Sequence, residues 1–164
     1  MKLKNFGLLE IIVILSGVYV ISMLIWTATT RSAVEAKANL VRDNHNKVVE
    51  LINNEINKCD RAEDDALTIW NDPCKGEWIA SKVTSYINKN LNIENPFSDD
   101  TEVKTDPDPR IKAEGRAGQS VEMGVIFLMS SNFSPDPGSE WIVGTCFKSP
   151  CVAAGNNELT SIYR

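Results

Sequence analysis

Four cysteines carry the most evident covalent chemistry of this chain: Cys59, Cys74, Cys146 and Cys151. None belongs to a C-x-x-C pair, and His45 does not stand beside any of them at metal-ligand spacing. An even number of cysteines without such spacing favours two disulfides in an oxidising compartment over a zinc site. Four cysteines allow three connectivities, and we predict the sequence-local one, Cys59 with Cys74 and Cys146 with Cys151.

Glu10 is the second residue of interest, because it is a carboxylate within an apolar segment that runs from Phe6 to Trp26. A charged side chain at the centre of a bilayer costs about 2.5–3.5 kcal/mol, and less near the interface, so such residues usually have a function. Two interpretations are open on spacing alone. Glu10 is either an interfacial carboxylate before a span that begins at Ile11, or a functional charge within the apolar segment.

His45 is the only histidine and lies between Val41 and Val48 on an apolar stripe, where packing is its simplest role. No nucleophile or second metal ligand can be tied to it by spacing. The chain also lacks the G-x-S-x-G, H-E-x-x-H and P-loop motifs. The sequence therefore predicts no catalytic site, no bound metal and no cofactor, and indicates that the protein is not an enzyme.

An acidic stretch offers a possible exception for calcium, which binds carboxylate oxygens. Its carboxylates are Asp99, Asp100, Glu102, Asp106 and Asp108. Their spacing does not match an EF-hand, so a solvated acidic loop is the favoured interpretation.

Composition limits the partners and the size of the fold. The 164 residues are 43% hydrophobic, which is enough for one modest globular domain and an additional segment. The net charge is -5 and the basic residues are scattered, so direct binding to nucleic acid is not expected.

The apolar segment from Phe6 to Trp26 is longer than the ~7–15 residues of a signal-peptide core and has no A-x-A cleavage site after it. About 20 apolar residues of helix span a bilayer, so we expect a retained membrane helix. Lys2 and Lys4 balance Arg31 and Lys37 across the span, and charge alone leaves its orientation open. Disulfides place the C-terminal domain outside the cytoplasm.

After Trp26 the apolar residues narrow to one stripe, spaced four and three residues apart: Val34, Ala38, Val41, His45, Val48 and Ile52. No proline or glycine lies between Val18 and Lys58. We therefore predict one helix from Phe6 to about Lys58, roughly 80 Å long at 1.5 Å per residue. Its first half is lipid-soluble, and its second half is amphipathic and needs a globular partner.

The remaining sequence predicts a short helix and three strands. The helix has Asp72 as N-cap and Pro73 at its first position, with Ile79, Val83, Ile87 and Leu91 facing inward. Asn95-Pro96 marks a turn, and a polar stretch follows to about Gln119. The strands are expected at Val121–Met129, Trp141–Phe147 and Leu159–Tyr163, paired antiparallel because their connections are short. The predicted fold class is α+β, a long N-terminal helix packed on a small antiparallel sheet.

The opening residues resemble a type IV prepilin: a short basic leader, Met-Lys-Leu-Lys-Asn, precedes Phe6, Glu10 follows four residues later, and then comes the apolar run. The resemblance implies cleavage between Asn5 and Phe6 by a prepilin peptidase and N-methylation of Phe6. It also implies a pilin-like fold with a leader at 1–5, an assembly segment at 6–30 and a globular domain at 31–164. Asn5 stands where the family usually has glycine, and the apolar segment lacks the proline common in pilins.

The function implied by this resemblance is that of a structural subunit of a type IV pilus or related filament, serving adhesion, motility or DNA uptake. The subunit would lie in the inner membrane as a single-pass protein and then assemble, with the pilus assembly machinery, into an extracellular helical filament. Glu10 would neutralise the Phe6 amine of a neighbouring subunit. Two alternatives are a periplasmic pseudopilin of a type II secretion system and a single-pass, membrane-anchored extracytoplasmic binding module.

Overall fold

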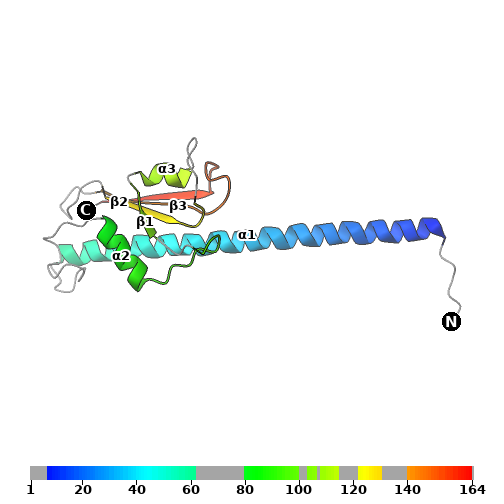
Figure 1. Ribbon diagram of the computed structural model, residues 1–164, viewed down its shortest axis with the longest axis horizontal. Helices are drawn as coiled ribbons and strands as arrows, with labels where there is room; N and C mark the ends of the chain where they lie inside the picture. Colours follow the sequence, from blue (N-terminus) through cyan, green and yellow to red (C-terminus); the bar gives the residue numbers. More distant parts are fainter. Residues whose placement is uncertain are drawn as a thin grey trace. The chain divides into compact units, whose positions relative to one another are not determined.

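The computed structural model describes residues 7–61, 80–99, 103–106, 108–114, 122–130 and 140–163. The element order is α1 (Leu8–Asp60), α2 (Ala80–Asn90), β1 (Val103–Thr105), α3 (Pro109–Glu114), β2 (Ile126–Ser130), β3 (Glu140–Cys146) and β4 (Asn157–Tyr163) (Figure 1). This order confirms the α+β class. The chain forms two compact units, Met1–Ala36 and Lys37–Arg164, and their boundary falls within α1.

Helix α1 confirms the prediction of a long N-terminal helix and comprises 53 residues. It begins after Gly7, whose carbonyl accepts the backbone N–H groups of Glu10 and Ile11 at 3.0 and 3.3 Å. Lys58 in its last turn complements the negative end of the helix dipole. The described start of α2 is Ala80, and the predicted N-cap at Asp72 lies outside the described residues.

The sheet has the order β1-β2-β3-β4 and is mixed. The three predicted strands pair antiparallel, with Leu128 opposite Val143 and Val143 opposite Thr160. The prediction of an antiparallel sheet is wrong at β1, which was not foreseen and lies parallel to β2, with Lys104 opposite Phe127. Parallel neighbours need a crossover connection, and the polar stretch that was expected to be a loop supplies one that contains α3.

The two faces of the sheet carry different helices in the second unit (Figure 1). Ile126 and Leu128 lie on the face that packs against α1 and α2, and Phe127, between them, is buried on the opposite face. On that opposite face α3 packs so closely that a Cβ on Gly144 would lie 2.6 Å from the carbonyl oxygen of Pro109. Glycine is therefore required at this position of β3.

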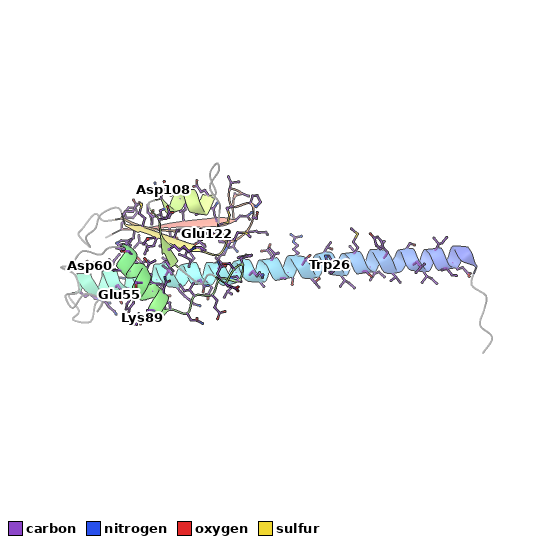
Figure 2. The ribbon with its side chains drawn as sticks, viewed as in Figure 1. Trp26, Glu55, Asp60, Lys89, Asp108 and Glu122 are labelled. Carbon is purple, nitrogen blue, oxygen red and sulfur yellow. A yellow bond between two sulfur atoms is a disulfide. The ribbon has the colours of Figure 1, made fainter. Side chains whose placement is uncertain are left out.

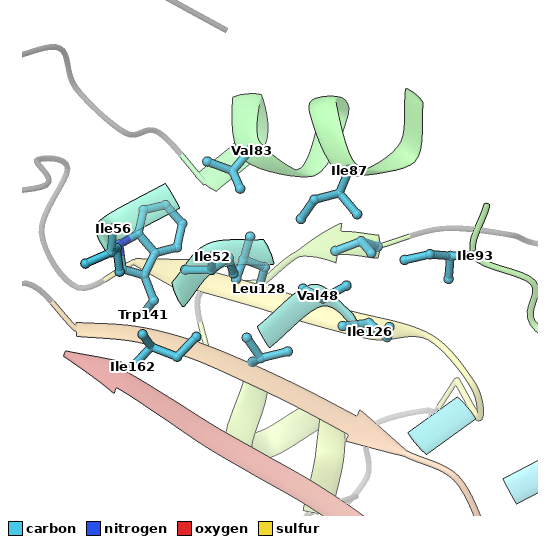
Figure 3. Close-up of a cluster of buried hydrophobic side chains, with 12 residues drawn as sticks. Val48, Ile52, Ile56, Val83, Ile87, Ile93, Ile126, Leu128, Trp141 and Ile162 are labelled. Atoms are coloured by element: carbon cyan, nitrogen blue, oxygen red, sulfur yellow. The ribbon is translucent and has the colours of Figure 1, made fainter. Parts of the chain in front are cut away.

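The main core lies between the second half of α1, α2 and one face of the sheet (Figure 3). Its buried members are Val48, Ile52, Ile56, Val83, Ile87, Ile93, Val103, Ile126, Leu128, Trp141, Val143 and Ile162. The predicted inward positions Val83 and Ile87 are confirmed, and Leu91 packs partly buried against the same cluster. The part of α1 in the second unit packs into this core through its apolar stripe.

The first position of the predicted stripe does not behave like the others. Ala38, Val41, His45, Val48 and Ile52 are buried, whereas Val34 remains 41% exposed. Val34 belongs to the first unit, so the stripe that packs on the domain begins at Ala38. Periodicity alone could not locate this boundary, because Val34 fits the same helical spacing.

Candidate functional site

The Glu10 carboxylate caps the N-terminus of α1. Its Oε2 accepts the backbone N–H of Gly7 at 3.0 Å, while the Gly7 carbonyl accepts the N–H of Glu10. The glutamate three residues after the N-cap thus satisfies an N–H at the helix start, as in a capping box. Its negative charge also lies at the positive end of the helix dipole. The sequence analysis did not predict this capping role. The spacing that could have indicated it is Gly7 three residues before Glu10, as in a capping box.

The serine and threonine hydroxyl groups of the apolar half of α1 are satisfied within the helix. Each donates to a carbonyl three or four residues earlier: Ser16, Ser22, Thr27, Thr29 and Thr30. In a lipid or apolar environment an unsatisfied polar group costs several kcal/mol, and these bonds avoid that cost. In the sequence between Phe6 and Thr30, Glu10 is the only charged residue.

The same segment exposes apolar side chains around the helix, as Figure 2 shows for the part of α1 that includes Trp26. Trp26 is 72% exposed, and large hydrophobic residues from Ile11 onward are also exposed. By length and composition, this helix is apolar enough to cross a membrane, and its most apolar window contains no buried residue. The chain therefore has one candidate membrane span among its described helices.

His45 joins α1 to the sheet inside the second unit. It is fully buried, and its Nδ1 and Nε2 atoms lie 2.9 Å from the hydroxyls of Thr145 on β3 and Thr160 on β4. A neutral imidazole donates from one nitrogen and accepts at the other, and a threonine hydroxyl suits either role. The packing role expected for His45 thus includes a specific polar link that the stripe pattern did not reveal.

Burial lowers the pKa of His45 from 6.5 to about 4, because the imidazolium would lose its hydration. The unfolded chain binds this proton near pH 6.5, whereas the folded protein does not bind it until about pH 4. The free energy of unfolding should therefore have its full value above pH 6.5, the pKa of His45 in the unfolded chain. It should fall by about 3 kcal/mol as the pH decreases from 6.5 to about 4.

Chemical denaturation of the full chain in non-ionic detergent, at a series of pH values, measures this loss. The control is His45→Gln, which keeps a hydrogen-bonding side chain without titrating in this range. The variant should lack the part of the pH slope that His45 contributes. Equal slopes in the two proteins would contradict the assignment.

Cys146 and Cys151 form a disulfide, with their Cα atoms 5.5 Å apart. The connection from β3 to β4, which contains this disulfide, folds back on itself, since the N–H groups of Phe147 and Lys148 both donate to the Asn156 carbonyl. Arg42 of α1 donates to the Gly155 carbonyl at 3.1 Å and lies 4.2 Å from the centroid of the Phe147 ring. The disulfide-bounded loop is thereby held against α1.

The other predicted disulfide, Cys59 with Cys74, lies outside the residues whose side chains are described. The predicted cleavage site at Asn5 and Phe6 also lies outside them. We predict that non-reducing peptide mapping of the native protein recovers both sequence-local pairs. Replacing Cys146 and Cys151 together by serine should lower the free energy of unfolding by about 2 kcal/mol, because the closed loop is short. A peptide that joins Cys59 to Cys146, or free thiols in the native protein, would contradict the pairing.

Two carboxylates of the acidic stretch, Asp106 and Asp108, have a structural role at the start of α3. Asp106 accepts the backbone N–H of Asp108 at 2.8 Å, and Asp108 accepts that of Arg110 at 3.1 Å. Among the described residues, no group of three or more acidic, histidine or cysteine side chains could hold a metal ion. These two carboxylates order the turn that leads into the helix.

The Asn95-Pro96-Phe97 turn is confirmed and is fixed by one side chain. Asn95 Oδ1 accepts the Phe97 N–H at 3.0 Å, and Asn95 Nδ2 donates to the Met123 carbonyl at 3.0 Å. The next residue, Gly124, has a φ of 81°, a left-handed conformation that favours glycine. The turn thus ties the chain after α2 to the segment before β2.

No protein-family description, curated protein or solved structure matches this chain.

Proposed function

We propose that this chain is a structural subunit of a type IV pilus or a related filament, which polymerises through the first half of α1. The observation that carries the proposal is the composition of that half. Up to Thr30 its exposed apolar surface contains one charged side chain, Glu10, placed in the first helical turn. Such a surface requires lipid or other apolar helices around it, and both surroundings suit a pilin-like subunit before and after assembly.

The cap at Gly7 is compatible with a role for Glu10 between subunits. A carboxylate has two oxygens with about four acceptor sites, and Gly7 occupies one of them. Its charge therefore stays available to the Phe6 amine of a neighbouring subunit after peptidase cleavage. Pairing the two charges would lower the cost of burying either one in the filament.

The second unit would be the globular domain that the subunit exposes on the filament surface. It has its own core, a sheet covered on both faces and a disulfide-bounded loop near its C-terminal end. In this proposal it lies on the extracytoplasmic side of the inner membrane before assembly and on the filament surface afterwards. It needs no catalytic residue or cofactor for that task.

Mass spectrometry of the N-terminus in membrane-extracted and sheared material tests the proposal. Cells should make the full chain together with a prepilin peptidase and a pilus assembly system. A start at N-methylated Phe6 is the expected result. An intact Met1 in a chain that remains in the membrane would favour the anchored binding module instead. Processing with assembly confined to the periplasm would favour the secretion pseudopilin.

A further inference from the structure

A polar groove lies between α2 and β1 in the second unit, outside the proposed assembly segment. It has a volume of about 420 Å³ and is lined by Ser81, Thr84, Ser85 and Asn88 from α2 and by Val103–Thr105 from β1. Among the described strands β1 lies at the edge of the sheet, since β2 is its one hydrogen-bonded neighbour there. The groove therefore borders a strand edge.

The side chain of Asn88 forms hydrogen bonds with this strand edge like those of a neighbouring strand. Asn88 Nδ2 donates to the Val103 carbonyl at 3.0 Å, and Asn88 Oδ1 accepts the Val103 N–H at 2.9 Å. A carboxamide thus makes the two hydrogen bonds that a neighbouring strand would make at Val103. The edge accepts an amide in this geometry.

The next pair of backbone groups on the same edge belongs to Thr105. Val103 directs its groups toward Asn88, whereas the Asp106 N–H donates to the Leu128 carbonyl of β2 at 3.2 Å. Because backbone groups alternate along a strand, the N–H and C=O of Thr105 point away from β2 and toward the groove. Thr105 also lines the groove and is exposed.

We propose that this groove binds an extended polypeptide segment of another protein, which pairs with β1 at Thr105 and lies beside α2. Strand addition at a sheet edge derives its affinity from main-chain hydrogen bonds and its specificity from the surface beside the edge. Here the exposed hydroxyls of Ser81 and Ser85, one helical turn apart, favour hydrogen-bonding side chains on the bound segment. This inference does not depend on the proposed filament function.

The two substitutions that test it differ in one backbone donor. Thr105→Pro removes the outward N–H without removing a β1–β2 hydrogen bond, since proline is tolerated at an edge whose N–H faces away from the sheet. Thr105→Val keeps that N–H and the branched side chain while removing the hydroxyl. Recognition of the main chain predicts that valine retains binding and proline loses it.

The probe is a phage-displayed random octapeptide library, selected on the full-length protein in detergent and counter-selected on Thr105→Pro. Selected peptides should bind the wild type and Thr105→Val equally and should bind Thr105→Pro about tenfold more weakly. Hydrogen exchange on the wild type provides a second measurement that needs no variant. The Thr105 amide should exchange more slowly when a selected peptide is bound.

The proposal is overturned if no peptide is enriched on the wild type over Thr105→Pro. It is also overturned if the enriched peptides bind both proteins equally, or if they leave the exchange of the Thr105 amide unchanged. A failure of Thr105→Pro to fold would leave the exchange measurement to decide.

Discussion

Glu10→Ala should reduce the incorporation of this chain into filaments by on the order of a hundredfold, while membrane insertion and the folding of the second unit persist. The reduction is expected because the Phe6 amine of a neighbouring subunit would be buried without its counter-ion, which costs about 3 kcal/mol or more. Insertion should become easier, since the only charged side chain of the apolar half is removed. Quantitative immunoblotting of sheared filaments and of membranes measures both effects.

Glu10→Gln separates the charge of this residue from its capping role. Glutamine retains an oxygen that can accept the Gly7 N–H, but it has no charge. It should therefore preserve the start of α1, and its filament yield should lie between those of the wild type and Glu10→Ala. Glu50→Ala, at an exposed position of the same helix in the second unit, is the matched control and should assemble normally.

Assembly of Glu10→Ala at the wild-type rate, when it is the sole source of subunits, would show that Glu10 is an interfacial residue. Wild-type assembly of Glu10→Gln would instead show that the Gly7 cap is sufficient. In either case the charge would have no part in assembly.

Removing the residues before Arg31 should convert a detergent-requiring protein into a soluble monomer. The deletion takes away the exposed large hydrophobic residues between Ile11 and Trp26. It keeps the buried stripe that starts at Ala38, together with the whole core of the second unit. Unfolding should remain cooperative, because the amphipathic half of α1 still packs on the sheet.

Sedimentation in detergent-free buffer and thermal unfolding measure this result. The matched control removes only the residues before Phe6 and should still require detergent. Aggregation of the Arg31 fragment, or unfolding without a cooperative transition, would count against independent folding of the second unit.

The parts of the fold that the sequence predicts are those with strong periodicity. The long helix follows from an apolar run and an amphipathic stripe that no proline interrupts. The strands β2, β3 and β4 follow from runs rich in β-branched and aromatic residues. Strand β1 has three residues and α3 has six, so neither is long enough to show a period. Their pairing and packing depend on distant partners, which is why the parallel edge was missed.

The side-chain interactions show the same limit. The Cys146–Cys151 pair is close in sequence and could be predicted. The bonds of His45 to Thr145 and Thr160 could not, because these threonines lie on strands 100 and 115 residues away in sequence. The groove beside β1 could not be predicted either, because it is formed in part by a strand that no local sequence pattern indicates.

Electron cryomicroscopy of sheared material tests self-assembly through α1 most directly. The cells should make the full chain with a prepilin peptidase and a pilus assembly system. We expect helical filaments in which the apolar halves of α1 pack together at the centre, with Glu10 beside the N-terminus of a neighbouring subunit. Recovery of the chain solely as a detergent-soluble membrane monomer, with no filament that contains it, would contradict self-assembly through α1.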